Sequence, residues 1–417
     1  MELVGRHIQS QIEGALEWAR VVMIHGARQS GKTTLAKAIV KSRGGTYVSL
    51  DDEAQLELAK ADPVSYLADQ RHPLVVDEFQ LAGDRLIRAV KQLVDAEQTP
   101  GRFLLAGSTN FLTVPNISES LAGRVQTFRL SPLSEAELAG TRPTEINSWF
   151  EGAPRISAVM PITRDEYLAL LCRGGYPEVI GLDSSARRRW FRSYIETVVQ
   201  RDIAALADIR RTAALPSLLQ WTAGLTSSHV NLSDAARKLQ VSRPVIASYF
   251  EWLQNVFLVH ELSAWTRNLA PRPARRPKFH LTDSGLAASL LRVDPEALTT
   301  PTAAAAGPLL ETFAVNEIER QLSASDRDIG LSHYRDSQGR EIDLILEGPN
   351  GGVVAVEIKA TRSPNSGQLQ HLAWLRDKLD IAAPSSFRAG VLLHTGDQSG
   401  KIGDRLHLRP INSLWTA

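Results

Sequence analysis

The sequence predicts an α/β protein with three successive regions, and three patterns lead to this prediction. An apolar run ends at Gly26, and the glycine-containing segment 26–34 leads from it into helical apolar spacing. The middle third has mostly helical spacing and contains two short helices joined by a turn at 232–250. Near the end of the chain, two β-like runs flank a turn within 340–359. Together these patterns predict a parallel sheet, then a helical and winged-helix region, then a second α/β region.

The segment 26–34 has the spacing G-x-x-x-x-G-K-T between a strand and a helix, which is the signature of the phosphate-binding loop of P-loop NTPases. Its glycines let successive backbone N–H groups point at phosphate oxygens, and the helix adds its positive N-terminal end. We expect Lys32 to bridge the β- and γ-phosphates and the Thr33 hydroxyl to bind Mg²⁺. The predicted nucleotide-binding residues are Gly26, Ala27, Arg28, Gln29, Ser30, Gly31, Lys32, Thr33 and Thr34.

Two further strands are expected to end beside this loop, because ligands of open parallel sheets bind at the carboxyl edge. The apolar run 73–78 ends in Asp77 and Glu78. Asp77 is expected to hold Mg²⁺ through its water shell, and Glu78 to orient or deprotonate the attacking water. The next strand ends in a polar tip that contains Ser108 and Asn110, which are candidate sensors of the γ-phosphate. Each of these tip residues, taken singly, fits a capped turn equally well.

Arg124 lies just before the strand-like run 125–130. An arginine in this place can enter the site of a neighbouring subunit and stabilise the charge that develops on the γ-phosphate. The alternative, a surface salt bridge, explains the spacing nearly as well. The first interpretation predicts a homo-oligomer with ATP sites between subunits.

At this point the sequence resembles prokaryotic AAA-type ATPases that carry a conserved C-terminal region of unknown function. The resemblance implies ATP rather than GTP, favours Arg124 as an arginine finger, and makes Ser108 or Asn110 the sensor. One slight departure is Ala27, where a small residue or proline usually follows the first glycine. The motifs that carry the resemblance lie at 26–34, 50–52, 75–80, 104–110, 121–125, 174–178, 201–203, 278–286 and 341–343.

The segment 232–250 is typical of a helix–turn–helix, with Ser233 and Ser242 as expected helix caps. The following segment, 265–281, is expected to form the wing of a winged helix. Basic residues beside such a motif suit contact with the DNA backbone, but winged helices also bind proteins, so both alternatives remain open. The cations concentrated in this wing are Arg267, Arg272, Arg275, Arg276 and Lys278.

The run 340–359 predicts a β-hairpin that brings Asp343 next to Glu357 and Lys359. An aspartate followed by Glu-x-Lys on the next strand is the pattern of the restriction-endonuclease-like fold. In that chemistry two carboxylates hold Mg²⁺ against the scissile phosphate, and the lysine positions or deprotonates water. A carboxylate on the preceding helix, Glu317 or Glu311, is expected to complete the metal site, and Gln368 is expected nearby. A charged hairpin whose Glu and Lys merely pair in solvent is the alternative.

The length of 417 residues predicts more than one domain, and we expect boundaries at 1–160, 161–300 and 301–417. The formal net charge of +1 gives no overall basic field toward nucleic acid. Cys172 is the single cysteine, which excludes an internal disulfide and fits a cytoplasmic protein. No membrane segment or signal peptide is expected.

Two functional hypotheses follow from these patterns. The first is an oligomeric ATPase acting on DNA with a metal-dependent nuclease-like C-terminal domain. The second is an ATP-gated regulatory switch whose C-terminal domain is a catalytically silent docking module. A third possibility treats the winged helix as the DNA reader of a transcription regulator.

Overall fold

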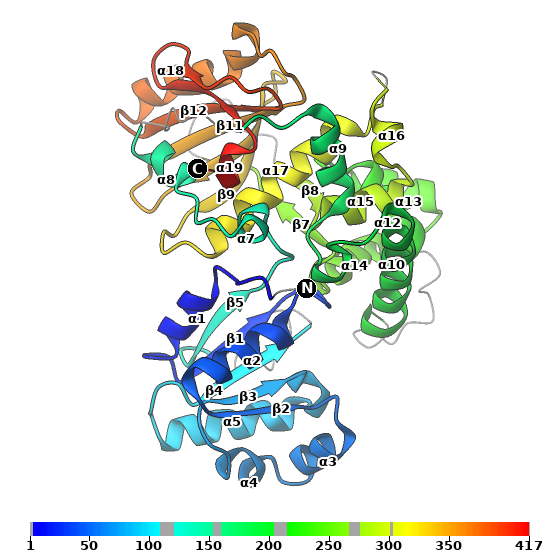
Figure 1. Cartoon of the computed structure of the whole chain (residues 1–417), viewed down its shortest axis with the longest axis vertical. Helices are drawn as coiled ribbons and strands as arrows, with labels where there is room; N and C mark the ends of the chain where they lie inside the picture. The colour runs from blue at the N-terminus through cyan, green and yellow to red at the C-terminus, as the bar shows by residue number, and fades with distance from the viewer. Residues whose placement is uncertain are drawn as a thin grey trace. The chain divides into compact units, whose positions relative to one another are not determined.

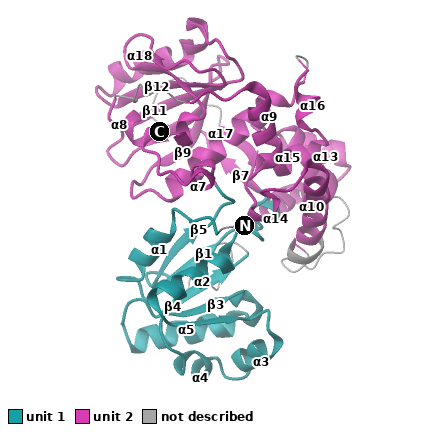
Figure 2. Cartoon of the chain, viewed as in Figure 1, with its two compact units in different colours: residues 1–133, 252–258 teal, residues 134–251, 259–417 magenta. Residues whose placement is uncertain are grey.

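The computed structural model describes residues 3–108, 121–152, 160–203, 215–266, 276–300 and 303–416. The chain forms two compact units (Figure 2). The first comprises Met1–Leu133 with Trp252–Leu258, and the second comprises Ser134–Glu251 with Val259–Ala417. The finer division into three domains, with the boundaries given above, remains a prediction.

A five-stranded sheet forms the centre of the first unit, in the order β2-β3-β4-β1-β5 (Figure 1). Every neighbouring pair of strands is parallel, which confirms the parallel sheet that the sequence predicts. The strands are β1 (Val21–His25), β2 (Thr46–Ser49), β3 (Leu74–Asp77), β4 (Phe103–Gly107) and β5 (Val125–Arg129). The helices are α1 (Gln9–Ala15), α2 (Lys32–Arg43), α3 (Glu53–Ala61), α4 (Pro63–Ala68), η1 (Phe79–Ala82) and α5 (Asp84–Ala96).

The strands β1, β3 and β4 are buried along their whole length. A strand of a parallel sheet that is covered on both faces has no solvent side, so its sequence is a continuous apolar run. Val76, Phe103 and Leu105 belong to the resulting hydrophobic core. The core therefore fixes where each strand ends, and the polar residues that follow β1, β3 and β4 lie at one edge of the sheet.

Helices dominate the first part of the second unit, as the sequence predicts. They include α7 (Glu135–Ala139), α8 (Glu145–Phe150), α9 (Arg164–Arg173), η3 (Pro177–Val179), α10 (Ser184–Thr197), η4 (Val198–Ile203), α12 (Leu215–Gly224), α13 (Leu232–Leu239), α15 (Ser284–Leu291) and α16 (Pro295–Leu298). The helix α14 (Arg243–Asn255) begins here, after Ser242, as expected. The cap of α13 differs from the expectation: Asn231 caps it by accepting a hydrogen bond from the Ser233 N–H, because the helix begins one residue before Ser233.

Three short strands accompany these helices in the order β6-β8-β7: β6 (Ser228–His229), β7 (Val259–Leu262) and β8 (Lys278–Leu281). The pairs β6–β8 and β7–β8 are antiparallel. Two helices followed by an antiparallel strand pair is the arrangement that the winged-helix pattern predicts. Of the expected wing cations, Arg267, Arg272 and Arg275 lie outside the described residues.

A six-stranded mixed sheet completes the second unit, in the order β13-β14-β12-β11-β10-β9. The strands are β9 (Gly330–Arg335), β10 (Glu341–Glu347), β11 (Val353–Lys359), β12 (Phe387–His394), β13 (Gly400–Lys401) and β14 (Leu406–Pro410). Helix α17 (Ala306–Ser323) precedes the sheet, and η6 (Ser366–Leu369) and α18 (Gln370–Ala382) connect β11 to its parallel neighbour β12; α19 (Ser413–Thr416) follows. The antiparallel pair β10–β11 is the hairpin that the sequence predicts.

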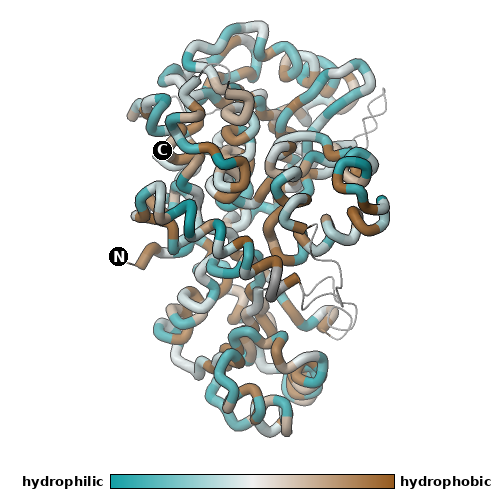
Figure 3. The backbone as a smooth tube through the Cα atoms, turned by 90° about the vertical axis from the view of Figure 1, so that its right-hand side faces the viewer, coloured by the Kyte–Doolittle hydropathy of each residue, from teal (hydrophilic) through white to brown (hydrophobic). Residues whose placement is uncertain are grey.

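The described residues contain no helix with the length and hydrophobicity that crossing a membrane requires. Hydrophilic and hydrophobic segments instead alternate at short intervals along the backbone (Figure 3).

Candidate nucleotide site and C-terminal acid cluster

The phosphate loop lies between the last residue of β1 and the first residue of α2, as the sequence predicts. The Leu130 N–H donates to the His25 carbonyl, so the backbone after β5 runs against the start of the loop. A Cβ atom at Gly26 would lie 2.1 Å from the Leu130 carbonyl oxygen, a distance that no side chain can adopt. At the other end, Gly31 has φ 97°, where glycine is favoured. Both glycines are therefore required by the backbone geometry of the loop.

Two side chains of this loop suit an anion at the N-terminus of α2. The Lys32 ammonium donates to the carbonyls of Gly26 and Ala27, at 2.9 and 2.8 Å, and its side chain lies across the loop. Within the described part of the chain, the buried hydroxyl of Ser30 has no hydrogen-bond partner. An orphaned donor, a bound ammonium and the positive end of a helix fit a phosphate group.

Thr33 and Asp77 meet at the carboxyl edge of the sheet. The Thr33 hydroxyl donates to a carboxylate oxygen of Asp77 at 2.5 Å, and the Tyr47 hydroxyl donates to the same oxygen at 2.8 Å. Burial, followed by the Asp77 charge, raises the pKa of Tyr47 well above its usual range, so this hydroxyl stays protonated. A hydroxyl beside a buried carboxylate is a donor set that fits Mg²⁺. No sequence motif points to Tyr47, although its strand ends at the same edge.

Glu78 and Ser108 also lie together at this edge. The Ser108 hydroxyl donates to the Glu78 carboxylate at 3.3 Å, and the Gln80 amide donates to the same carboxylate oxygen. Burial raises the pKa of Glu78, and the Lys32 charge opposes that shift. Of the two candidate sensors, Ser108 therefore reaches the predicted water-activating residue, while Asn110 lies outside the described residues. Gln80 is a contact that sequence reasoning missed, although it follows Glu78 by only two positions.

Arg124 lies at the opposite edge of the same sheet. The Val21 N–H, at the start of β1, donates to the Arg124 carbonyl, whereas the phosphate loop follows the end of β1. The length of β1 separates the two by roughly 13 Å. The guanidinium is held in a two-point pair by Asp95, with Nε–Oδ1 at 2.5 Å and Nη2–Oδ2 at 3.0 Å. The surface salt bridge that the sequence left open is therefore present.

A second group of charged side chains lies on the β10–β11 hairpin. The register that pairs Leu344 with Val356 puts Asp343 opposite Glu357, so both carboxylates share one face of the sheet. The Lys359 ammonium joins them, at 2.5 Å from Glu357 and 3.5 Å from Asp343. The pairing of β9 with β10 is shifted between Ile342 and Ile345, and such bulges re-aim side chains. The predicted trio of Asp343, Glu357 and Lys359 is thus brought together.

The helix carboxylate that lies near this group is Glu311. Glu317, which was also expected there, points elsewhere. The buried Glu317 carboxylate accepts from the N–H groups of Glu135 and Ala136, at 2.9 and 3.4 Å, and so caps α7. Glu311 and Glu317 are six positions apart, which places them about 240° apart around the helix. Gln368 is also elsewhere, because its side chain accepts from the Asn365 N–H.

Lys278 does not lie on an exposed basic wing, which corrects the expectation from the sequence. Its side chain is 1% exposed, because β8 brings it against α17 and the C-terminal sheet. Its ammonium lies 2.9 Å from Glu311, 2.6 Å from Glu341 and 3.6 Å from Asp343. We call Lys278, Glu311, Glu341 and Asp343 the acid cluster. A further missed neighbour is His371, whose Nδ1 lies 2.8 Å from the Glu341 carbonyl and 3.7 Å from Glu357.

The acid cluster does not fit a divalent metal as it stands. Among the described residues, no group of three or more His, Cys, Asp or Glu side chains has an arrangement that could hold a metal ion. The centre between Glu311, Glu341 and Asp343 is instead occupied by an ammonium group.

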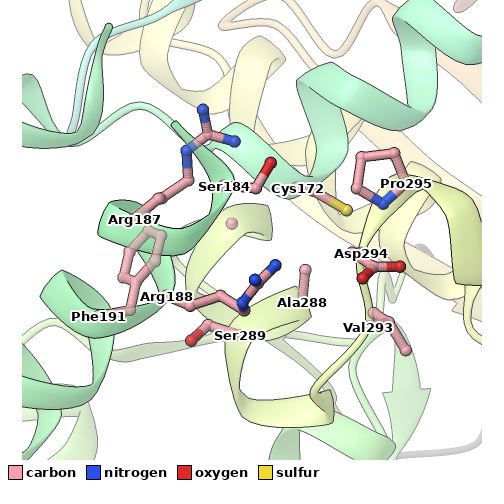
Figure 4. Close-up of a pocket in the computed structure, with 11 residues that line it drawn as sticks. Cys172, Ser184, Arg187, Arg188, Phe191, Ala288, Ser289, Val293, Asp294 and Pro295 are labelled. Atoms are coloured by element: carbon pink, nitrogen blue, oxygen red, sulfur yellow. The ribbon is translucent and has the colours of Figure 1, made fainter. Parts of the chain in front are cut away.

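A small pocket lies beside Cys172, between α9, α10 and α15 (Figure 4). Its volume of about 20 Å³ is enough for a water molecule and too small for a nucleotide. Burial raises the pKa of the Cys172 thiol to about 12, so the thiol is neutral and unreactive at ordinary pH. The Arg187 and Arg188 side chains line the same pocket.

Comparison with known proteins agrees with the fold of the first unit. Residues 19–139 match the family described as AAA domain. Residues 164–297 and 306–414 match two families described as domains of unknown function, DUF8612 and DUF4143. Residues 19–139 are thus similar to the AAA-type P-loop ATPases. More particularly, the chain combines this AAA region with a C-terminal region that matches DUF4143.

Relatives match between 64% and 88% of this chain. An uncharacterized protein of Mycobacterium tuberculosis is 29% identical over 88% of this chain and 76% of its own length. An uncharacterized protein of Haemophilus influenzae is 20% identical over 64% of this chain and 68% of its own.

Two solved structures show weaker similarity. A Walker-type ATPase of Pyrococcus abyssi is 14% identical, covers 70% of this chain and 97% of its own, and has a TM-score of 0.42. The RuvB Holliday junction branch migration motor of Thermotoga maritima is 16% identical, covers 62% of this chain and 89% of its own, and has a TM-score of 0.29.

Proposed function

We propose that the protein binds and hydrolyses ATP at the carboxyl edge of its parallel sheet. The observation that carries the proposal is the convergence of Lys32, Thr33, Asp77 and Glu78 from two separate segments at one edge. In this proposal the loop N–H groups and Lys32 bind the phosphates, and Glu78 orients the attacking water and accepts its proton. Ser108 and Gln80 hold the Glu78 carboxylate in place. A Mg²⁺ ion held by Thr33 and, through water, by Asp77 would neutralise phosphate charge.

Arg124 has a role in this proposal only between subunits. Its position at the far edge of the sheet keeps it from the phosphate loop of its own chain, but leaves it at a surface that a second copy can approach. The protein is therefore proposed to act as a homo-oligomer. Its single cysteine agrees with a proposed place in the cytoplasm. Asp95 would hold the guanidinium until a neighbouring γ-phosphate competes for it.

The ATP proposal is tested by two substitutions with opposite signatures. Lys32→Ala is expected to abolish ATP binding, because it removes the charge that faces the β- and γ-phosphates. Glu78→Gln is expected to keep ATP binding and stop turnover, because the amide cannot accept the proton of water. Binding is measured with a fluorescent ATP analogue and turnover by phosphate release. Wild-type affinity in Lys32→Ala would contradict the assignment of the loop, and equal loss of binding in both variants would contradict the role of Glu78.

For the C-terminal region we propose the silent alternative rather than a metal-dependent nuclease. The face shared by Asp343, Glu357 and Lys359 supports a nuclease-like arrangement. The ammonium of Lys278 among the carboxylates favours the interpretation without metal chemistry. ATP binding would then gate assembly or partner binding, and action on DNA stays a lesser alternative. A DNA-cleavage assay tests this proposal. The purified chain is incubated with single- or double-stranded DNA and Mg²⁺ or Mn²⁺, with and without ATP. Cleavage that Asp343→Asn abolishes would reject the silent proposal.

A further inference from the structure

We propose that the Lys278 ammonium is the resident cation of the acid cluster and that it locks β8 to the C-terminal sheet. This inference gives a physical reason for the proposed lack of metal-dependent catalysis in the C-terminal region, and it rests on that part of the proposed function. It is independent of ATP hydrolysis.

The geometry around Lys278 is that of a caged cation. Carboxylates approach its ammonium from two different elements: Glu311 from α17, and Glu341 and Asp343 from β10. Such oxygen donors are the ligands that Mg²⁺ and Mn²⁺ prefer. The lysine ammonium thus pairs with the kind of oxygen donors that a hard cation would take.

Burial of a lysine is costly unless its charge is paired, so this placement needs the carboxylates. Burial by itself lowers the pKa of Lys278, but Glu311, Asp343 and Glu341 together raise it well above its usual range. The dependence is mutual, because the three carboxylates would repel one another without the ammonium. Other cations lie at the rim: Lys359 pairs with Asp343, and Arg335 approaches Glu341 at 3.5 Å.

The lysine also connects two parts of the second unit. β8 belongs to the three-stranded sheet beside the helix–turn–helix, where Lys278 lies opposite Leu262 and His229. The carboxylates belong to the region 306–414 that matches a separate family. The ion pairs therefore join the winged-helix sheet to the C-terminal sheet.

Replacing the ammonium should convert the cluster into a metal site. Lys278→Met keeps an unbranched apolar side chain that is one atom shorter, and it removes the ammonium and its charge. We expect this variant to bind one Mn²⁺ per chain at least tenfold more tightly than wild type. Because ligands that bind the folded state raise its stability, we also expect Mn²⁺ to raise its Tm by several degrees. Adding Glu311→Gln to Lys278→Met should abolish both gains.

The experiment uses the full nucleotide-free chain, Mn²⁺ as the probe, electron paramagnetic resonance for binding and calorimetry for Tm. Lys359→Met is the matched control, because Lys359 also contacts Asp343 but leaves Lys278 in place; it should gain no Mn²⁺ binding. A folded Lys278→Met that gains no Mn²⁺ site overturns the inference, as does an equal gain in Lys359→Met.

A second measurement does not depend on the folding of Lys278→Met. Wild type and Glu311→Gln should bind Mn²⁺ equally weakly, because the ammonium already occupies the cluster. A wild-type Mn²⁺ site that Glu311→Gln removes would overturn the inference. Neither measurement contains DNA. A failed Mn²⁺ result would therefore reject only the inference about Lys278, whereas DNA cleavage would reject the silent proposal itself.

Discussion

At the scale of single residues, the nucleotide site depends on positions where only one side chain fits. Gly26 is the clearest case, because the Leu130 carbonyl oxygen occupies the place that a Cβ would take. Glu78 is a different case, since its left-handed backbone (φ 52°) is uncommon for a residue other than glycine. Strained backbone of this kind is found at functional sites, where the surrounding structure maintains it.

We predict that Gly26→Ala lowers the stability of the protein and abolishes ATP binding, because the new methyl group forces the phosphate loop away from β5. The cost should be on the order of 2–4 kcal/mol, as for other severe steric conflicts in a packed interior. Chemical denaturation and nucleotide titration measure the two effects. Gly14→Ala is the control, since a Cβ there has no neighbour within 4 Å and alanine favours the helix. Normal ATP binding by a stable Gly26→Ala would contradict the close approach.

At the scale of elements, a buried ion pair joins α8 to β14. The Arg409 guanidinium binds the Glu145 carboxylate at two points, 2.6 and 2.9 Å, and the two side chains are 1% and 0% exposed. The Trp149 indole N–H donates to the same carboxylate at 3.0 Å. A short early helix is thereby tied to a strand near the end of the chain, a connection that no local sequence pattern indicates.

We predict that Arg409→Met lowers the free energy of unfolding by about 3–5 kcal/mol, because it leaves the Glu145 charge buried without its partner. Urea denaturation followed by tryptophan fluorescence measures the change. Arg327→Met serves as the comparison: its pair with Glu151 is exposed, so the loss should stay below about 1 kcal/mol. Similar losses in the two variants would show that burial does not determine the strength of the Arg409 pair.

At the scale of the whole molecule, the proposed ATPase needs more than one copy of the chain. The sheet puts the phosphate loop and Arg124 at its two opposite edges, so a single chain cannot bring them together. The exposed pair with Asp95 adds little stability by itself and can be exchanged for a stronger anion.

We predict that Arg124→Ala keeps ATP binding near normal but lowers hydrolysis by about a thousandfold or more, as loss of an arginine finger does elsewhere. Mixing is the decisive measurement. Subunits with Arg124→Ala and subunits with Glu78→Gln should regain activity together, because one interface in the mixture combines an intact Glu78 with an intact Arg124. Mixed oligomers that stay inactive would argue against a role in trans, and would leave Arg124 as the surface partner of Asp95.

The sequence by itself determined the features that depend on neighbouring residues. The spacing at 26–34 fixes a loop between a strand and a helix, and apolar runs that end in Asp77 and at Ser108 fix one edge of a parallel sheet. Period-2 alternation fixes the shared face of Asp343 and Glu357, because a hairpin leaves only two faces to choose from.

The partners that those residues meet depend on how the chain folds. The charge of Lys278 predicts an exposed wing, yet β8 packs against α17 and buries it, and burial depends on contacts made far along the chain. Glu311 and Glu317 look alike in the sequence, but one faces the acid cluster and the other caps α7, because the packing of α17 sets the direction of each face. Arg124 fits a finger and a salt bridge equally well until the fold brings Asp95 beside it. Ion pairs join charges whose separation in sequence carries no signal, so their geometry appears only when the chain has folded.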